Sequence, residues 1–164
     1  MHDKSLAQLR HQLTALSTVL KKAEAHCEAR KIDPQAILGF RLYPDMLAFM
    51  RQVQIACDFA KAAAARLAGE TVPSYADEEK SFADLQARIA KTLAFIDGLG
   101  KDRYAASDKR QVTVKVAGQD RTMSGEDYFN SFVLPNFYFH ATIAYAILRH
   151  NGIELGKGDF LGRG

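Results

Sequence analysis

The chain has 164 residues, of which 48% are hydrophobic and 25% are charged, a balance typical of a globular domain with its own core. The net charge of +3 is small, and acidic and basic residues alternate along the chain, so we expect no nucleic-acid partner. Neither cysteine, Cys27 or Cys57, belongs to a CxxC motif, which indicates buried free thiols in a reducing compartment.

The polar N-terminal region lacks the apolar segment of a secretory signal peptide. No apolar run approaches the ~20 residues that a bilayer-spanning helix needs. We therefore expect a cytoplasmic protein with no membrane partner.

Residues 5–30 carry leucines at alternating spacings of three and four, the pattern of a helix in a bundle. A loop that contains Pro34 and Gly39 should follow. A second helix is expected to begin at Pro44, because proline is favoured in the first turn, and to end at Gly69.

A third helix should begin after Ser81, which has Asp84 three residues later, as in a capping box. Residues 111–116 then alternate polar and apolar side chains, the period of a half-buried strand. Residues 117–120 can turn and residues 121–123 can return, which predicts a small hairpin packed on the helices.

The last long helix should start after Ser124, be kinked by Pro135 and stop at Asn151-Gly152. The glycine-rich tail should fold back on the bundle. Four long helices with short connections predict one all-α domain, residues 1–164, built as a four-helix bundle with a β-hairpin inserted before the last long helix.

His140 shares a stripe of the last helix with apolar residues and should therefore point into the bundle. Asn136 adjoins this stripe one turn earlier. On the second helix, Gln54 and Asp58 lie one turn apart beside the seam. If the second and last helices are neighbours, these four polar groups can converge.

Two interpretations of His140 follow from the residues. One is a metal or ligand site inside the bundle, where facing helices usually supply histidine and carboxylate ligands. The other is a buried polar network in which His140 bonds to Asn136, Asp58 or Tyr145. A single histidine with Asn and Gln is a poor metal-binding set, so chemistry alone favours the network. The sequence contains no nucleotide-binding, serine-hydrolase or zinc-protease motif, and it leaves open whether the protein is an enzyme.

The sequence resembles a bacterial family of uncharacterised proteins within the DinB/YfiT-like superfamily. The resemblance covers nearly the whole chain. It is carried by residues 23–26, 41–46, 63–69, 135–140 and 156–162.

The resemblance implies a four-helix bundle that is often a homodimer. In better-understood superfamily members three histidines bind zinc or nickel, and some of those members are thiol transferases. By this comparison His140 matches the second histidine of an HxxxH motif and Asn136 the first, while the second-helix ligand falls near Gln54 or Ile55. Only one ligand of the metal triad remains, so no cofactor is expected.

Three hypotheses follow. The first is a DinB-like bundle that binds a small molecule in an interior pocket near His140, Asn136, Gln54, Asp58 and Tyr145. The second is a divalent-metal-dependent enzyme, similar to the thiol transferases, with His140 as a metal ligand. The third is a dimeric structural or regulatory protein whose aromatic surface forms the interface.

Overall fold

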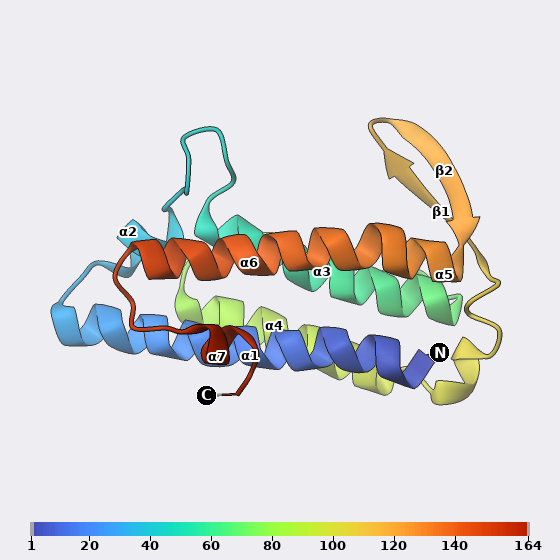
Figure 1. The fold of residues 1–164 in the computed structure, drawn as a ribbon, viewed down its shortest axis with the longest axis horizontal. Coiled ribbons are helices and arrows are strands. Elements are labelled where there is room, and N and C mark those ends of the chain that lie inside the picture. The colour runs from blue at the N-terminus through green and yellow to red at the C-terminus, as the bar shows by residue number, and fades with distance from the viewer. Residues whose placement is uncertain (1, 164) are drawn as a thin grey trace.

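The computed structural model describes residues 2–163, with side chains from residue 6 onward. The chain is mostly helical and has one antiparallel two-stranded hairpin. Its four long helices run side by side along the longest axis of the molecule (Figure 1). They are α1 (His2–Arg30), α3 (Phe49–Ala68), α4 (Phe82–Gly98) and α6 (Leu134–His150). Buried side chains from these four helices form a continuous hydrophobic core, which includes both free cysteines.

A short helix, α2 (Pro34–Leu38), occupies the region after α1 where we expected only a loop. Asp33 caps it, since its carboxylate accepts a hydrogen bond of 2.9 Å from the backbone N–H of Gln35. Pro34 then fits the first turn, where a missing N–H costs nothing. The Asp-Pro pair was therefore a helix start.

The second long helix, α3, begins at Phe49, so the expected start at Pro44 is wrong. Residues 41–48 form a loop that is closed where the N–H of Phe49 donates to the carbonyl of Phe40 at 2.8 Å. Proline is as favourable in a turn as in a first helical turn, and the loop uses it in that way. The predicted end is confirmed, because Gly69 terminates α3 with a φ of 76°.

Helices α3 and α4 run in the same direction, since their first residues, Phe49 and Phe82, are in ring contact at 6.2 Å. Residues 70–81 must therefore return along the whole bundle, and the expected short connection is wrong. This crossover segment contacts α3 on its way, because the ring centre of Tyr75 lies 3.9 Å from the ammonium group of Lys61. The capping of α4 is confirmed, because the Ser81 hydroxyl accepts from the backbone N–H of Asp84.

Helices α1 and α6 run in the opposite direction to α3 and α4. Near one end of the bundle Arg10 of α1 pairs with Asp97 of α4 at 2.8 Å. The rings of Phe59 in α3 and Phe132, just before α6, are 5.8 Å apart. In chain order, the long helices α1, α3, α4 and α6 therefore run up, down, down and up.

The hairpin is confirmed as strands β1 (Gln111–Val116) and β2 (Gln119–Ser124). The 3-10 helix η1 (Lys101–Tyr104) leads into it. Val112 and Val114 are buried, so one face of β1 packs on the protein as expected.

The last helical region has three parts: α5 (Gly125–Asp127), a π-helical segment η2 (Tyr128–Val133) and α6. The Ser124 cap is confirmed by its hydrogen bond from the N–H of Asp127. Pro135 lies just after the π-helical segment. A proline removes one helical hydrogen bond and crowds the preceding turn, and the wider π-turn accommodates both effects.

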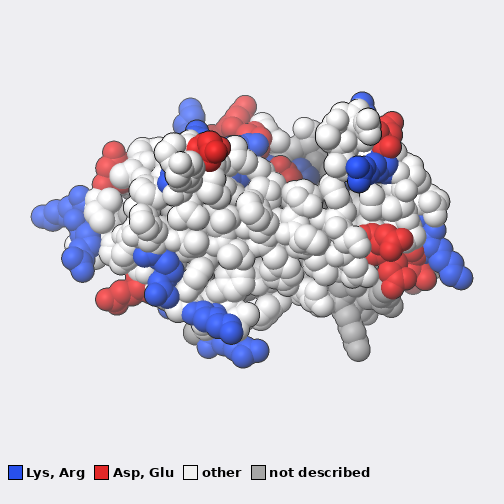
Figure 2. Space-filling model, turned by 45° about the horizontal axis from the view of Figure 1, so that its top comes forward, with Lys and Arg blue, Asp and Glu red and all other residues white. Residues whose placement is uncertain are grey.

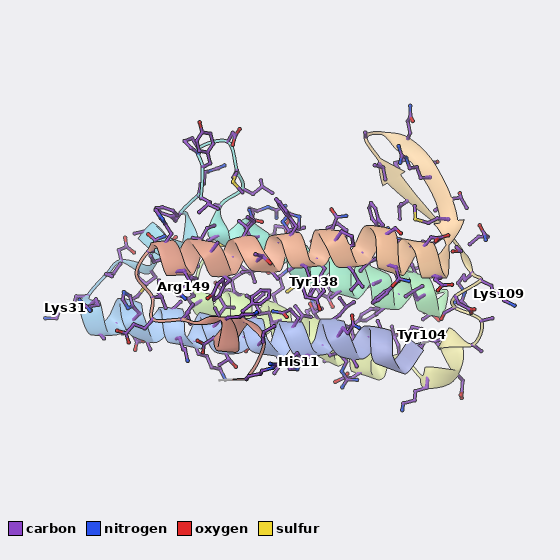
Figure 3. The ribbon with its side chains drawn as sticks, viewed as in Figure 1. His11, Lys31, Tyr104, Lys109, Tyr138 and Arg149 are labelled. Atoms are coloured by element: carbon purple, nitrogen blue, oxygen red, sulfur yellow. The ribbon has the colours of Figure 1, made fainter. Side chains whose placement is uncertain are left out.

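The tail folds back on the bundle as expected. It carries the short helix α7 (Lys157–Phe160), beside which the imidazole of His11 in α1 lies (Figure 3). The ring of Phe160 packs on Tyr145 of α6 at 5.5 Å, and Asp159 pairs with Lys22 of α1 at 2.5 Å.

The segment Gly125–His150 is long and apolar enough to cross a membrane by length and composition alone, which corrects the expectation that no such run exists. In the fold it packs along α3, but only 33% of its most apolar window is buried. The last helix therefore has a core-facing side and an open side.

Candidate functional site

His140 lies on the flank of α6 that faces α3, and it is half-buried. Its Nδ1 is 2.7 Å from Oε1 of Gln52, in the first turn of α3. The ring stacks on Phe59, with an interplanar angle of 19°, and meets Phe139 edge-on at 5.2 Å. The expectation that His140 points toward the interior is therefore met on one side of the ring only.

Gln52 holds the His140 ring in this position and is itself held by the backbone. It is 1% exposed, and its Nε2 donates a 3.0 Å hydrogen bond to the backbone carbonyl of Leu47. Among the side chains that the structure describes, Gln52 is the one hydrogen-bond partner of the His140 ring, so Nε2 of His140 keeps its bonding capacity.

Burial lowers the pKa of His140 below its usual range, because the surroundings disfavour the imidazolium. The ring is therefore neutral at neutral pH. A neutral imidazole with one fixed nitrogen can accept a hydrogen bond, take up a proton or ligate a metal through the other.

The remaining predicted site residues do not join His140. Asn136 donates to the carbonyl of Phe132 at 2.7 Å, within its own helical turn. Tyr145 accepts from Arg149 at 3.1 Å near the end of α6, where Figure 3 shows Arg149 beside the tail.

Gln54 and Asp58 lie on the opposite face of α3, toward α4 and the crossover segment. The Gln54 amide accepts from Arg51 at 2.6 Å and donates to Glu79 at 2.7 Å. Asp58 accepts from Lys61 at 2.8 Å. Residues two apart on a helix differ by about 200° in direction, so Gln52 and Gln54 cannot serve the same site.

Arg88 of α4 is the centre of this second group and is 3% exposed. Its guanidinium bonds to Glu79 at 2.8 Å, to Asp58 at 3.0 Å and to Asp77 at 3.0 Å. It also donates to the carbonyl of Ala76 in the crossover segment. Hydrogen bonds from Arg88 and Gln54 outweigh burial and hold the pKa of Glu79 below its usual range. This cluster fastens the crossover segment to the bundle.

The donors near His140 do not fit a transition metal. Nδ1 is engaged by Gln52, the neighbouring rings of Phe59 and Phe139 offer no lone pairs, and amide oxygens are weak ligands for zinc or nickel. Among the described side chains, residues 6–163, no three His, Cys, Asp or Glu come together as a ligand set.

The cysteines offer no alternative nucleophile. Burial raises the pKa of the Cys57 thiol to about 12, which keeps it protonated. Burial also raises the pKa of Cys27.

The part of the surface around His140 that α6 supplies is uncharged. Between Tyr128 and Leu148 the chain has no Asp, Glu, Lys or Arg, and Phe139 is 54% exposed on the open side of α6. The loop 41–48 adds the exposed side chains of Leu42, Tyr43 and Leu47. Figure 2 shows a broad white area on this face, with the charged residues around it.

The cavities whose lining is described lie elsewhere. One of about 430 Å³ opens between the crossover segment and α4, beside Tyr75, Glu79, Arg88 and Lys91. Another of about 480 Å³ lies between α1 and the tail, beside His26 and Arg30. His140 lines neither of these two cavities.

Comparison with known proteins agrees with this fold. A family model described as a domain of unknown function, DUF1993, matches residues 1–161. The chain belongs to the DUF1993 family. A crystal structure of a DinB family member protein from Shewanella denitrificans, at 1.83 Å resolution, is similar to the DUF1993 chain, with a TM-score of 0.89 and 40% sequence identity. The alignment covers 96% of this chain and 89% of that one. No curated protein matches the sequence.

The DinB-like fold inferred from the sequence is thus confirmed for this DUF1993 protein. One correspondence changes. The α3 residue that meets His140 is Gln52, and not Gln54 or Ile55 as the sequence comparison suggested. The sequence did not show which face of α3 meets α6, and Gln52 was therefore missed.

Proposed function

We propose that this DUF1993 protein is a metal-independent binding protein that holds a small molecule beside His140 and acts as a homodimer. The observation that supports it best is the hydrogen bonding of the His140 ring, because Gln52 binds Nδ1 while Nε2 has no hydrogen-bond partner among the described side chains, residues 6–163. His140 is half-buried, so its ring can be reached from outside and Nε2 can bind a ligand. On this proposal the four long helices act as one cytoplasmic four-helix bundle.

The second copy is proposed to cover the open side of α6. The 17 residues of α6 give a ridge about 25 Å long, and it is uncharged up to Arg149. Interface centres are depleted in charge and enriched in aromatic side chains. This face carries two exposed aromatic side chains, Phe139 and Tyr43. The loop 41–48 and the hairpin project from the same side of the molecule (Figure 1), so a two-fold partner on α6 would lie between them and close the site over His140.

A metal-dependent, thiol-transferase-like enzyme is less well supported, because the only imidazole at the site is paired with an amide. A dimer without any ligand would use the same face. It is favoured by the exposed aromatic residues, and only a binding measurement separates it from the first proposal.

The dimer is tested by light scattering of the wild-type protein and of Phe139→Lys. We expect wild type at twice the 18.2 kDa monomer mass and the variant at the monomer mass, because a buried lysine at a symmetric interface faces its own copy. The matched control is Ala94→Lys, which adds the same charge at an exposed position of α4. A monomeric wild type would contradict the dimer.

The absence of a metal is tested by elemental analysis of untagged protein and of His140→Ala. We expect no stoichiometric metal in either. Zinc or nickel bound one to one in the wild type and lost in the variant would replace our proposal with the metal-dependent alternative.

A further inference from the structure

We infer that Gln52 determines the class of ligand at this site, because it holds the His140 ring with the proton on Nδ1 and leaves Nε2 as a hydrogen-bond acceptor. The ligand is then an uncharged molecule with an aromatic or apolar body and one hydrogen-bond donor. This inference rests on the proposed function and specifies its ligand.

The direction of the hydrogen bonds follows from the backbone. The carbonyl of Leu47 can only accept, so the Gln52 atom 3.0 Å from it must be the amide nitrogen. The other Gln52 atom, which faces His140, is therefore the oxygen, and it too can only accept. At 2.7 Å from that oxygen, Nδ1 of a neutral His140 must carry the proton.

The proton on Nδ1 leaves a lone pair on Nε2. A group that binds there must donate, as a phenol hydroxyl, an indole or an amide does. Gln52 thus acts as a positioning residue. The loop 41–48 fixes the orientation of the Gln52 amide through the backbone carbonyl of Leu47.

The surroundings determine the rest of the ligand. Phe59 stacks on the imidazole and Phe139 stands beside it, so the neighbouring surface is aromatic. The helix that carries His140 supplies no charged side chain before Arg149, so an ionic ligand would lose hydration here without gaining a counter-charge from α6. An uncharged aromatic molecule with a hydrogen-bond donor loses the least hydration free energy when it binds here.

The ring proton can be measured directly by nitrogen NMR of the histidine side chains in the wild-type protein. We expect the His140 signal of an unprotonated Nε2 and a protonated Nδ1. Gln52→Met should shift the proton toward Nε2, because the acceptor is gone. Gln54→Met is the matched control, a buried glutamine two residues away whose partners are Arg51 and Glu79, and it should leave the ring unchanged.

Ligand class is tested with three probes of similar body: para-cresol, para-methylanisole and para-toluate. Wild type should bind para-cresol about three- to tenfold more tightly than para-methylanisole, the value of one hydrogen bond, and should bind para-toluate most weakly. Gln52→Met should lose this preference and Gln54→Met should keep it.

A wild-type ring protonated at Nε2 would overturn the inference without any variant, so the test survives a variant that fails to fold. Binding of all three probes at His140 with equal affinity would also overturn it, while leaving the proposed function standing. If no probe perturbs His140, the proposed function fails, and the ligand class fails with it.

Discussion

The two sides of α3 handle buried polar groups in opposite ways. On the side of α4, charged residues form a cluster around Arg88 in which acid and base are paired, and the cluster binds the crossover segment to the helices. On the side of α6, one imidazole and one amide share a single hydrogen bond within an uncharged surface. Within the ionic cluster the Nη atoms of Arg88 and the carboxylates bond to one another. A single neutral pair leaves an atom for another molecule, which is why we place the ligand there.

The largest expected effect comes from Arg88→Met, which removes the central arginine of the ionic cluster between α3 and α4. Glu79 would lose its main partner in a nearly buried position, and we expect the free energy of unfolding to fall by about 3 kcal/mol. The value lies at the low end of the range for buried pairs because Asp58 and Asp77 can be rehydrated. Urea denaturation measures it, and limited proteolysis of residues 70–81 should accelerate.

Arg10→Met is the control for this change, since it also removes an arginine from an ion pair, but at the surface. We expect a loss of no more than about 1 kcal/mol. Equal losses for the two variants would mean that the Arg88 cluster is no more important than a surface pair.

Next in size is the comparison of the two buried glutamines. Gln52→Met and Gln54→Met each remove two hydrogen bonds and should each cost about 1–3 kcal/mol, with Gln54→Met the more costly because its partners are charged. Urea denaturation of both variants checks the order. A much larger loss for Gln52→Met would indicate that the α6 side, and not the α4 side, holds the fold together.

The smallest expected effect is a pH dependence that belongs to His140. Its pKa is lowered in the folded state, so the unfolded chain binds a proton first as the pH falls below about 6.5. The stabilisation from neutral His140 is complete above that pH and is lost as the pH falls through the folded-state pKa. His140→Gln should therefore have a urea midpoint that declines less than that of wild type between about pH 7.5 and pH 5.5.

The other histidines cancel in this comparison because both proteins contain them. Parallel declines in wild type and variant would show that His140 has no lowered pKa, and hence that its ring is not held neutral by burial.

The helices were predictable wherever a local signal marked them. The leucine spacing of α1, the Ser81 and Ser124 caps and the glycine at the end of α3 act within one or two turns, so the sequence specifies them directly. Pro44 misled the prediction because proline suits a turn and a helix start equally well.

By itself, therefore, the sequence determined a mostly helical chain of DinB-like fold with a hairpin before its last long helix, and it identified His140 as a polar residue in an apolar stripe. Only the tertiary structure decided which face of α3 meets α6. That choice depends on the crossover segment, whose contacts join residues far apart in the chain, and it placed Gln52 rather than Gln54 beside His140. Helical periodicity assigns side chains to faces, but the packing of the other helices decides what each face contacts.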